Sequence, residues 1–306
     1  MRTIGLLLLA AALARAEAAR ADGATRLDVR EKGSLQNPVW SPDGGSILLT
    51  RFRNGYNAGP ADLLVLDLST RKTRVLVSDG SDNVCLPGSS WSAARRAIVF
   101  SSSREPHDDV YVIAEDGRLG SERRLTERED EVAYEPTWSP DGEWILFESH
   151  PLDVEGRGVI RKAPFARPRE VTALTGEGDD ARQPNWAPAG DRIVYQRYDG
   201  TRWELWTMKP DGSGKAQVTA GEGDKTDAAF SPDGERIVYS MDPEDDADLY
   251  VVPSSGGEPV RVTRAPAYDG APSWSPDGKR IAFESCPEAD PDESTGTRLW
   301  VVDAPR

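Results

Sequence analysis

Histidine and cysteine are scarce in this chain, which has two of each among its 306 residues. The histidines, His107 and His150, are expected in loops between strands, where most imidazoles are plain surface residues. Together with Asp108, Asp109 or Asp153 they would offer a metal only an incomplete zinc-type ligand set. The chain also lacks the Gly-x-Ser-x-Gly sequence of a nucleophile elbow. These absences favour a binding protein over an enzyme.

Long hydrophobic segments are absent too, apart from Ile4–Ala14, an apolar run of 11 residues. That run is too short to cross a bilayer as a helix, which needs about 20 residues. With a basic residue before it and Ala16-Glu17-Ala18 after it, the run is typical of a secretory signal peptide. We predict a signal peptide at residues 1–18, with Ala14 and Ala21 as alternative cleavage points. The mature protein is then periplasmic or secreted and does not span the membrane.

Positive charge is in deficit, because 37 lysines and arginines stand against 52 acidic residues and give a net charge of −15. Loss of the signal peptide removes two positive charges (Arg2, Arg15) and one negative charge (Glu17), which brings the net charge to −16. Nucleic acids bind basic surfaces. The sign of the charge therefore excludes a nucleic acid as a partner.

Six aromatic residues, here called anchors, recur at spacings of 44 to 51 residues, each followed seven positions later by isoleucine. Four anchors precede Ser-Pro-Asp-Gly, which suits a tight turn between two strands. A period in this range with short strands is typical of four-stranded propeller blades. The anchors are Trp40, Trp91, Trp138, Trp186, Phe230 and Trp274, and their partners are Ile47, Ile98, Ile145, Ile193, Ile237 and Ile281.

The strand after each turn is apolar at three successive positions, as in Ile145-Leu146-Phe147, so we expect it to be buried on both faces. A third and a fourth strand follow in each repeat, but the last repeat reaches Arg306 without a fourth. Thr25–Arg30 has the pattern of that strand. We therefore predict an all-β fold for residues 19–306: a six-bladed β-propeller of four-stranded antiparallel blades, closed by the N-terminal strand joining the C-terminal blade.

Acidic runs fall in connections that should emerge on one face of the propeller, opposite the Ser-Pro-Asp-Gly turns. One mouth of the central tunnel is therefore expected to be strongly acidic. The alternative is that these loops are merely solvated and bind nothing. The runs are Glu127–Glu131, Asp179-Asp180, Asp242–Asp248 and Glu288–Glu293.

The residue three positions before each anchor differs in type from repeat to repeat, whereas the core positions repeat the same apolar character. Because packing makes blade cores repeat, variation at one rim is where a specific site can be built on a symmetric scaffold. Three more aspartates lie a few residues upstream on the same face. We predict that a protein or peptide with a cationic segment binds here, contacting Asn37, Glu135, Gln183, Asp227, Asp180, Asp224 and Asp269; Gly88 and Ala271 are the two non-polar members of the variable set.

Cys85 and Cys286 are also expected in loops of the acidic face, but in blades that are not neighbours. A disulfide would need their alpha carbons within about 7 Å, and the sequence leaves this pairing open. No cofactor is predicted, although a Ca²⁺ ion in an acidic loop is an alternative that needs no recognisable loop motif. A monomer is expected.

The repeated pattern, as in Trp138–Phe147, resembles the WD40-like repeats of the TolB propeller family. The resemblance runs from about Thr25 to the end of the chain. TolB is a periplasmic component of the Tol–Pal system and binds the lipoprotein Pal at the mouth of its propeller. It carries an α/β domain before that propeller, whereas only about twenty residues separate the predicted signal peptide from Trp40 here. A counterpart of that domain is therefore not expected.

The resemblance and the acidic mouth together imply an exported protein- or peptide-binding scaffold of the cell envelope. Similar propellers also precede the hydrolase domain of prolyl oligopeptidase-type enzymes and occur in sugar lyases with histidine-rich metal sites. The alternative function is therefore an envelope enzyme, a sugar lyase or hydrolase, that uses mouth carboxylates with or without a bound cation. A purely structural partner of a separately encoded protein is a third hypothesis.

Overall fold

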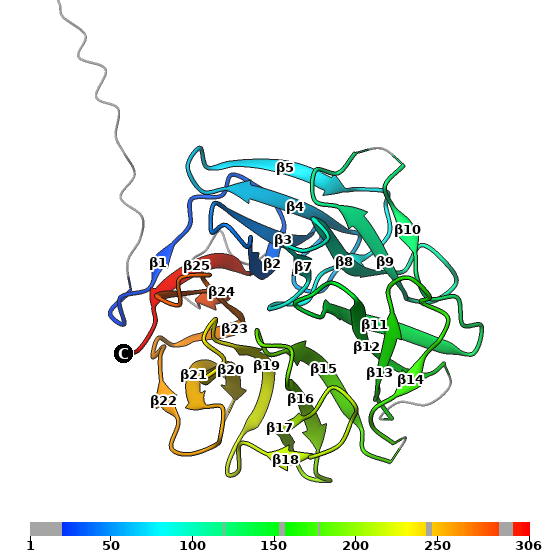
Figure 1. Cartoon of the computed structure of the whole chain (residues 1–306). Helices are drawn as coiled ribbons and strands as arrows, with labels where there is room; N and C mark the ends of the chain where they lie inside the picture. Colours follow the sequence, from blue (N-terminus) through cyan, green and yellow to red (C-terminus); the bar gives the residue numbers. More distant parts are fainter. Residues whose placement is uncertain (1–19, 119, 153–156, 177, 243–246, 288–295) are drawn as a thin grey trace, which may run out of the picture.

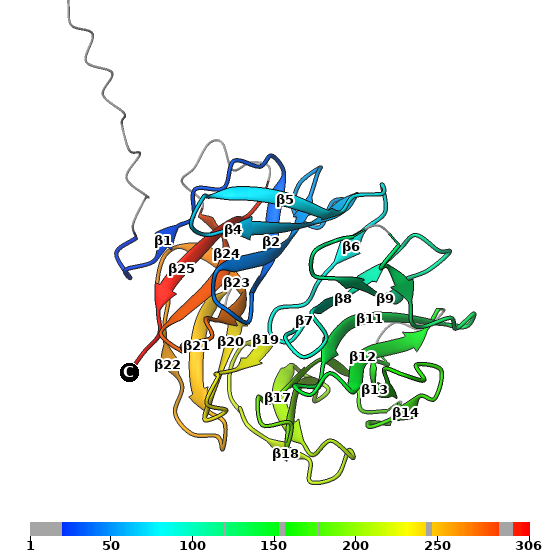
Figure 2. The same ribbon diagram turned by 45° about the horizontal axis from the view of Figure 1, so that its top comes forward.

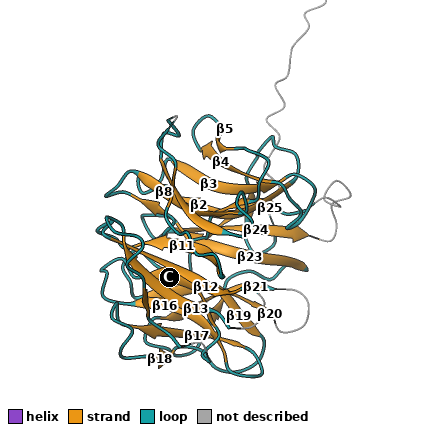
Figure 3. Ribbon diagram, turned by 90° about the vertical axis from the view of Figure 1, so that its right-hand side faces the viewer, coloured by secondary structure: helices purple, strands orange, loops and turns teal. Residues whose placement is uncertain are grey.

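The computed structural model describes residues 20–118, 120–152, 157–176, 178–242, 247–287 and 296–306. Within these ranges the chain forms 25 strands and no helix, and the strands make six sheets around a central axis (Figures 1 and 3). The predicted all-β six-bladed propeller is confirmed. The predicted signal peptide (1–18), the run Glu288–Glu293 and residues 243–246 of another acidic run lie outside the described residues.

Four blades follow one plan, in which successive antiparallel strands run outward from the axis (Figure 1). Blade 1 consists of β2 (Ser34–Trp40), β3 (Ser46–Phe52), β4 (Ala61–Asp67) and β5 (Lys72–Val77). Blade 3 consists of β11 (Glu131–Trp138), β12 (Trp144–Pro151), β13 (Val159–Pro164) and β14 (Thr172–Ala173). Blade 4 consists of β15 (Ala181–Trp186), β16 (Ile193–Tyr198), β17 (Trp203–Met208) and β18 (Ala216–Gln217). Blade 5 consists of β19 (Asp224–Phe230), β20 (Arg236–Asp242), β21 (Asp248–Pro253) and β22 (Val260–Arg261).

Blade 2 departs from this plan because its innermost strand is split. The two halves, β6 (Asn83–Val84) and β7 (Trp91–Ser92), both pair with β8 (Ala97–Ser102). The blade continues with β9 (Asp109–Ala114) and β10 (Arg123–Arg124). In this repeat the anchor Trp91 is followed by Ser92-Ala93-Ala94-Arg95 and not by Ser-Pro-Asp-Gly.

The ring closes as predicted, with the N-terminal strand added to the last blade. That blade contains β23 (Ala267–Trp274), β24 (Arg280–Pro287) and β25 (Arg298–Asp303), and β1 (Thr25–Arg26) pairs antiparallel with β25 (Figure 2). The backbone N–H of Leu27 adds a bond of 2.9 Å to Leu299 O. Pairing is therefore shorter than the six residues expected from the sequence, but it covers the outer edge of the blade.

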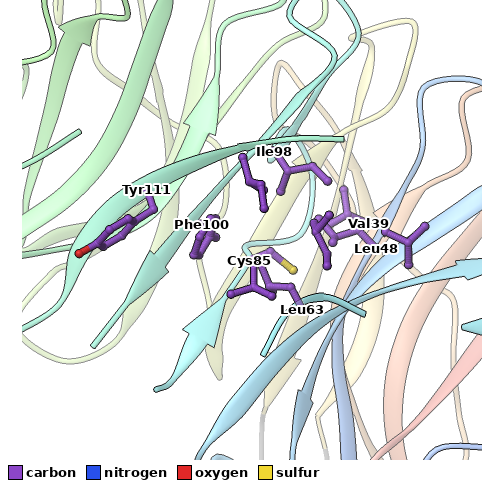
Figure 4. Packing of buried hydrophobic residues seen from close by; sticks show 11 residues of the cluster. Val39, Leu48, Leu63, Cys85, Ile98, Phe100 and Tyr111 are labelled. Carbon is purple, nitrogen blue, oxygen red and sulfur yellow. The ribbon is translucent and has the colours of Figure 1, made fainter. Parts of the chain in front are cut away.

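The hydrophobic core lies mainly between adjacent blades, which buries their strands on both faces. Figure 4 shows the cluster between blades 1 and 2, where Leu48 and Leu63 pack towards Phe100. Cys85, in the connection between β6 and β7, is buried in this cluster, and its burial raises the pKa of the thiol to about 12. Cys85 and Cys286 form no disulfide.

The Ser-Pro-Asp-Gly segments form the predicted hairpin turns. In the first, Ser41 Oγ donates to Asp43 Oδ1 at 2.6 Å, and the same carboxylate accepts the N–H of Gly45 at 2.9 Å. Gly44 has φ of 73°, a conformation that favours glycine. These hydrogen bonds, that of Ser41 first, lower the pKa of Asp43 below its usual range.

The described part of the chain contains no helix that could span a bilayer.

Candidate functional site

The variable positions before the anchors lie at β-bulges in the innermost strands. Strand pairing shifts register there in five blades, for example between Tyr134 and Thr137 of β11. A bulge leaves an extra residue outside the ladder, and its N–H must find another acceptor. The residues adopt positive φ in all six blades: Asn37 (51°), Gly88 (99°), Glu135 (50°), Gln183 (50°), Asp227 (56°) and Ala271 (50°).

Side chains of the preceding blade supply most of these acceptors. Glu135 Oε2 accepts the N–H of Gln183 at 3.1 Å, and Gln183 Oε1 accepts the N–H of Asp227 at 2.8 Å. The carboxylate of Asp227 in turn accepts the N–H of Ala271. Glu135, Gln183 and Asp227 therefore have a structural role as well, because each of them satisfies the bulge of the next blade.

Glu284 completes this series, and sequence reasoning did not identify it. Ala271 has no side-chain acceptor, and Glu284 Oε2 of the same blade accepts the N–H of Asn37 at 2.8 Å. Glu284 is only 2% exposed. Its position, ten residues after the anchor, holds Glu148 in blade 3 but uncharged residues in the other four blades, which is the one signal that could have indicated it.

Four carboxyl groups that belong to this series of bulge contacts or lie beside it have raised pKa values. Burial, with a contribution from the charge of Asp227, raises the pKa of Glu284 to about 8. Burial also raises the pKa of Glu135, Asp227 and Glu148. Glu135 and Glu148 are in hydrogen-bonding contact, and the charge of Glu135 raises the pKa of Glu148 further. Such a pair shares a proton.

Aromatic side chains stand next to these carboxyl groups. Tyr56, from the loop between β3 and β4, packs edge-on against Tyr268 with ring centroids 5.7 Å apart, and the two hydroxyls lie 3.2 Å from each other. Burial and the charges of Glu284 and Asp227 raise the pKa of Tyr268 well above its usual value. Carboxylates and aromatic faces together are the chemistry that binds ammonium and guanidinium groups.

Blade 3 contributes a second aromatic pair, in which Tyr134 OH and His150 Nε2 lie 3.1 Å apart. His150 is therefore a half-buried strand residue and not a loop residue as expected. The other histidine, His107, contacts Arg128 O at 2.7 Å through Nε2. Among the described residues, no three histidine, cysteine or acidic side chains come together as a metal-binding group.

The three upstream aspartates lie in different environments. Asp180 is half-buried and accepts hydrogen bonds from Gly158 N at 3.0 Å and Arg182 Nε at 3.1 Å. Asp224 is exposed and accepts the N–H of Trp203 at 2.9 Å.

Asp269 was predicted to contact the partner, but its side chain is not available for such a contact. Its side chain is fully buried, and Arg20 occupies both carboxylate oxygens. The structure thus brings Glu135, Gln183 and Asp227 into contact, while Asn37 bonds to Glu284, which feels the charge of Asp227. Asp180 and Asp224 stay separate from that series.

Asn185, one position before the anchor of blade 4, connects the innermost segments of blades 2 and 5 by hydrogen bonds. Its Nδ2 donates to Pro87 O and Ala228 O at 3.0 Å each, and its Oδ1 accepts from Ser89 N at 3.0 Å. A Cβ at Gly88 would lie 2.5 Å from Asn185 Oδ1, which explains the glycine there. On the turn side of Asn185, a cavity of about 350 Å³ is lined by the anchors and the turn prolines.

Fold and mouth together define a six-bladed repeat propeller whose mouth carries carboxyl groups and aromatic rings. The sequence profile of the TolB beta propeller domain matches residues 16–228 and 183–292. The chain belongs to the TolB β-propeller family.

Relatives agree with this assignment. The chain is 28% identical over 164 residues to the Tol-Pal system protein TolB of Francisella tularensis subsp. mediasiatica, covering 54% of this chain but only 35% of that protein. A solved putative TolB from Agrobacterium tumefaciens superimposes with a TM-score of 0.67 at 19% identity, covering 90% of this chain and 91% of that one. An oligogalacturonate lyase in complex with manganese gives 0.61 at 16% identity, covering 94% and 96%. At these identities the two structures show the fold alone.

Proposed function

We propose that this protein is an exported binding scaffold of the cell envelope that recognises a cationic segment of a protein or peptide at the mouth described above. One observation carries the proposal: Glu135, Asp227 and Glu284 have no ion-pair partner in the part of the chain that the structure describes. Elsewhere, buried acids such as Glu204 and Asp62 pair with basic side chains. Unpaired carboxyl groups favour a ligand that brings positive charge.

Family membership supports the location. A relative in the family is a Tol-Pal system protein, and the N-terminal sequence of this chain has the pattern of a secretory signal peptide. We therefore propose a periplasmic protein, acting as a monomer, with an envelope protein as its partner. Calcium at an acidic loop is not required by this proposal.

A second candidate function is an envelope lyase or hydrolase, and the Glu135–Glu148 pair is the observation that favours it. Two carboxyl groups that share a proton can act as acid and base, and Arg182 Nε lies 3.7 Å from Glu148 Oε1. This candidate requires turnover of a cell-wall or acidic oligosaccharide that Glu148→Gln abolishes. Turnover unaffected by that substitution, or no turnover at all, would leave the binding function as the better account.

Binding of tetralysine measured by calorimetry tests the first candidate. Affinity should fall as salt rises, because the attraction is between charges that salt screens. Asp227→Asn combined with Glu135→Gln should weaken binding roughly tenfold or more without lowering the melting temperature, since the amide oxygens still accept the bulge N–H groups and two buried acidic groups are removed. Glu235→Lys, in an exposed turn of the opposite face, is the matched control. Salt-independent binding would refute the proposal.

The pH dependence of tetralysine binding should be the reverse of that of stability. Glu284, with its pKa raised from 4.5 to about 8, holds more protons in the folded than in the unfolded protein between these values. Stability without ligand should therefore fall as pH rises through this window. A cation prefers the deprotonated carboxylate, so affinity should increase from pH 6 to pH 9 with release of protons. Calorimetry at pH 7 in two buffers of different ionisation enthalpy measures that release, and a value of zero would contradict this assignment.

A further inference from the structure

Arg20 is bound to the last blade through the two terminal nitrogens of its guanidinium group. Its guanidinium donates to Asp269 Oδ1 at 2.8 Å and to Oδ2 at 2.6 Å, and it also donates to Ser285 Oγ at 3.1 Å and to Asp22 Oδ2 at 2.9 Å. The side chain of Asp269 is 0% exposed and that of Arg20 is 9% exposed. This bidentate, desolvated geometry is that of the stronger ion pairs in proteins.

Further contacts of Arg20 and Asp22 join this segment to blade 6 and blade 5. The guanidinium carbon lies 5.7 Å from the ring centroid of Phe283 and 5.3 Å from that of Trp300. Arg20 N donates to Ala24 O at 2.8 Å, so that the backbone turns directly into β1. Asp22 Oδ2 accepts the N–H of Arg264, which follows the last strand of blade 5, at 3.1 Å. Arg20 therefore touches β23, β24 and β25 and leads into β1, the four strands of blade 6.

This arrangement bears on where the leader is removed, because the sequence allows cleavage after Ala14, Ala18 or Ala21. Cleavage after Ala21 would remove Arg20 and leave the carboxylate of Asp269 buried without its partner, which is strongly destabilising. Cleavage after Ala18, at the Ala-Glu-Ala sequence, keeps Arg20 as the second residue of the mature chain.

We propose that the leader is cut on the N-terminal side of Arg20, after Ala18 by the sequence pattern, and that Arg20 then latches the new N-terminus onto blade 6. The latch fixes the segment that supplies the closing strand, so it stabilises the closed ring. The inference rests on the export part of the proposed function and is independent of what binds at the mouth.

The intact mass of the protein purified from the periplasm of an expressing bacterium tests the position of the cut. We expect the mass of a chain that begins at Ala19, and any cleaved chain that begins between Arg15 and Arg20 agrees with the proposal. A chain that begins after Arg20 overturns it. A chain that keeps its whole leader overturns both the cleavage and the export on which it rests, whereas the function of the latch is tested separately below.

A double-mutant cycle on the purified exported protein tests the latch. Arg20→Ala and Asp269→Asn should each lower the melting temperature, Arg20→Ala by about 5 to 8 °C, as expected when one partner of a buried pair is lost from a chain of this size. The double variant should be more stable than Arg20→Ala alone, because the unpaired carboxylate is gone. Asp28→Asn, an exposed carboxylate beyond β1, is the control and should change nothing. Additive effects, or an unchanged melting temperature for Arg20→Ala, overturn the latch.

Discussion

Replacing Lys225 by alanine is expected to destabilise the protein by about 3–5 kcal/mol. Lys225 Nζ lies 3.0 Å from Glu204 Oε1, and both side chains are only 2% exposed. The same ammonium donates to Gly221 O at 2.9 Å, and Glu204 Oε2 accepts from Thr219 Oγ1 at 2.7 Å. Loss of the lysine would leave Glu204 buried and unpaired between blades 4 and 5, a state that its single remaining hydrogen bond does not offset.

Urea denaturation monitored by tryptophan fluorescence measures this loss. Lys279→Ala is the matched control, because that lysine is 80% exposed and lies 4.0 Å from Asp277; its effect should stay within about 0.5 kcal/mol. The pair Lys225→Met with Glu204→Gln should recover much of the loss, since no unpaired charge remains. If Lys225→Ala and Lys279→Ala had equal effects, the buried ion pair would not have the role assigned to it.

Ile145→Ala should cost about 2–5 kcal/mol through the cavity that it opens. Ile145 is 2% exposed and packs with Trp138, Val99 and Val110 in the cluster between blades 2 and 3. Glu129→Ala, an exposed change in the loop before β11, should stay within about 0.5 kcal/mol. The same denaturation experiment compares them. Similar values for the two substitutions would mean that the position seven residues after an anchor is not a core position.

The fold could be predicted because the signals that specify it repeat along the chain. Each anchor with its isoleucine marks one pair of inner strands, and packing between blades imposes the same apolar positions on all six copies. Closure could be predicted because Thr25 and the following residues match a strand missing from the last repeat. The turn residues act locally, so their sequence alone specifies the hairpin.

The site could be predicted only in part, because its residues are defined by neighbours in space. The sequence grouped Glu135 and Asp227 by their position before the anchors, but their hydrogen bonds to the next blade depend on bulges and positive φ that a single sequence does not show. Glu284 compensates for Ala271, a relation between residues 13 positions apart on two paired strands. In the sequence, Asp269 looks like Asp180 and Asp224, since all three are aspartates a few residues before the variable positions. Only its contact with Arg20 explains why it is buried.

A polar residue at the bulge satisfies the next blade whether it is Gln183 or Asp227, since both supply an acceptor oxygen. The scaffold therefore requires an acceptor, but not a charge. The choice of carboxylates at Glu135 and Asp227, where an amide would serve the fold, is consistent with selection for a cationic ligand.

Chemical cross-linking of the purified protein into an envelope extract tests the central proposal most directly. Wild type and Glu235→Lys should capture the same protein, and the double variant Asp227→Asn with Glu135→Gln should lose it. Raising the salt concentration before cross-linking should reduce the capture by wild type. Capture that survives the double variant unchanged, or that Glu235→Lys abolishes, would contradict the account, since the partner would then bind outside the carboxyl-lined mouth.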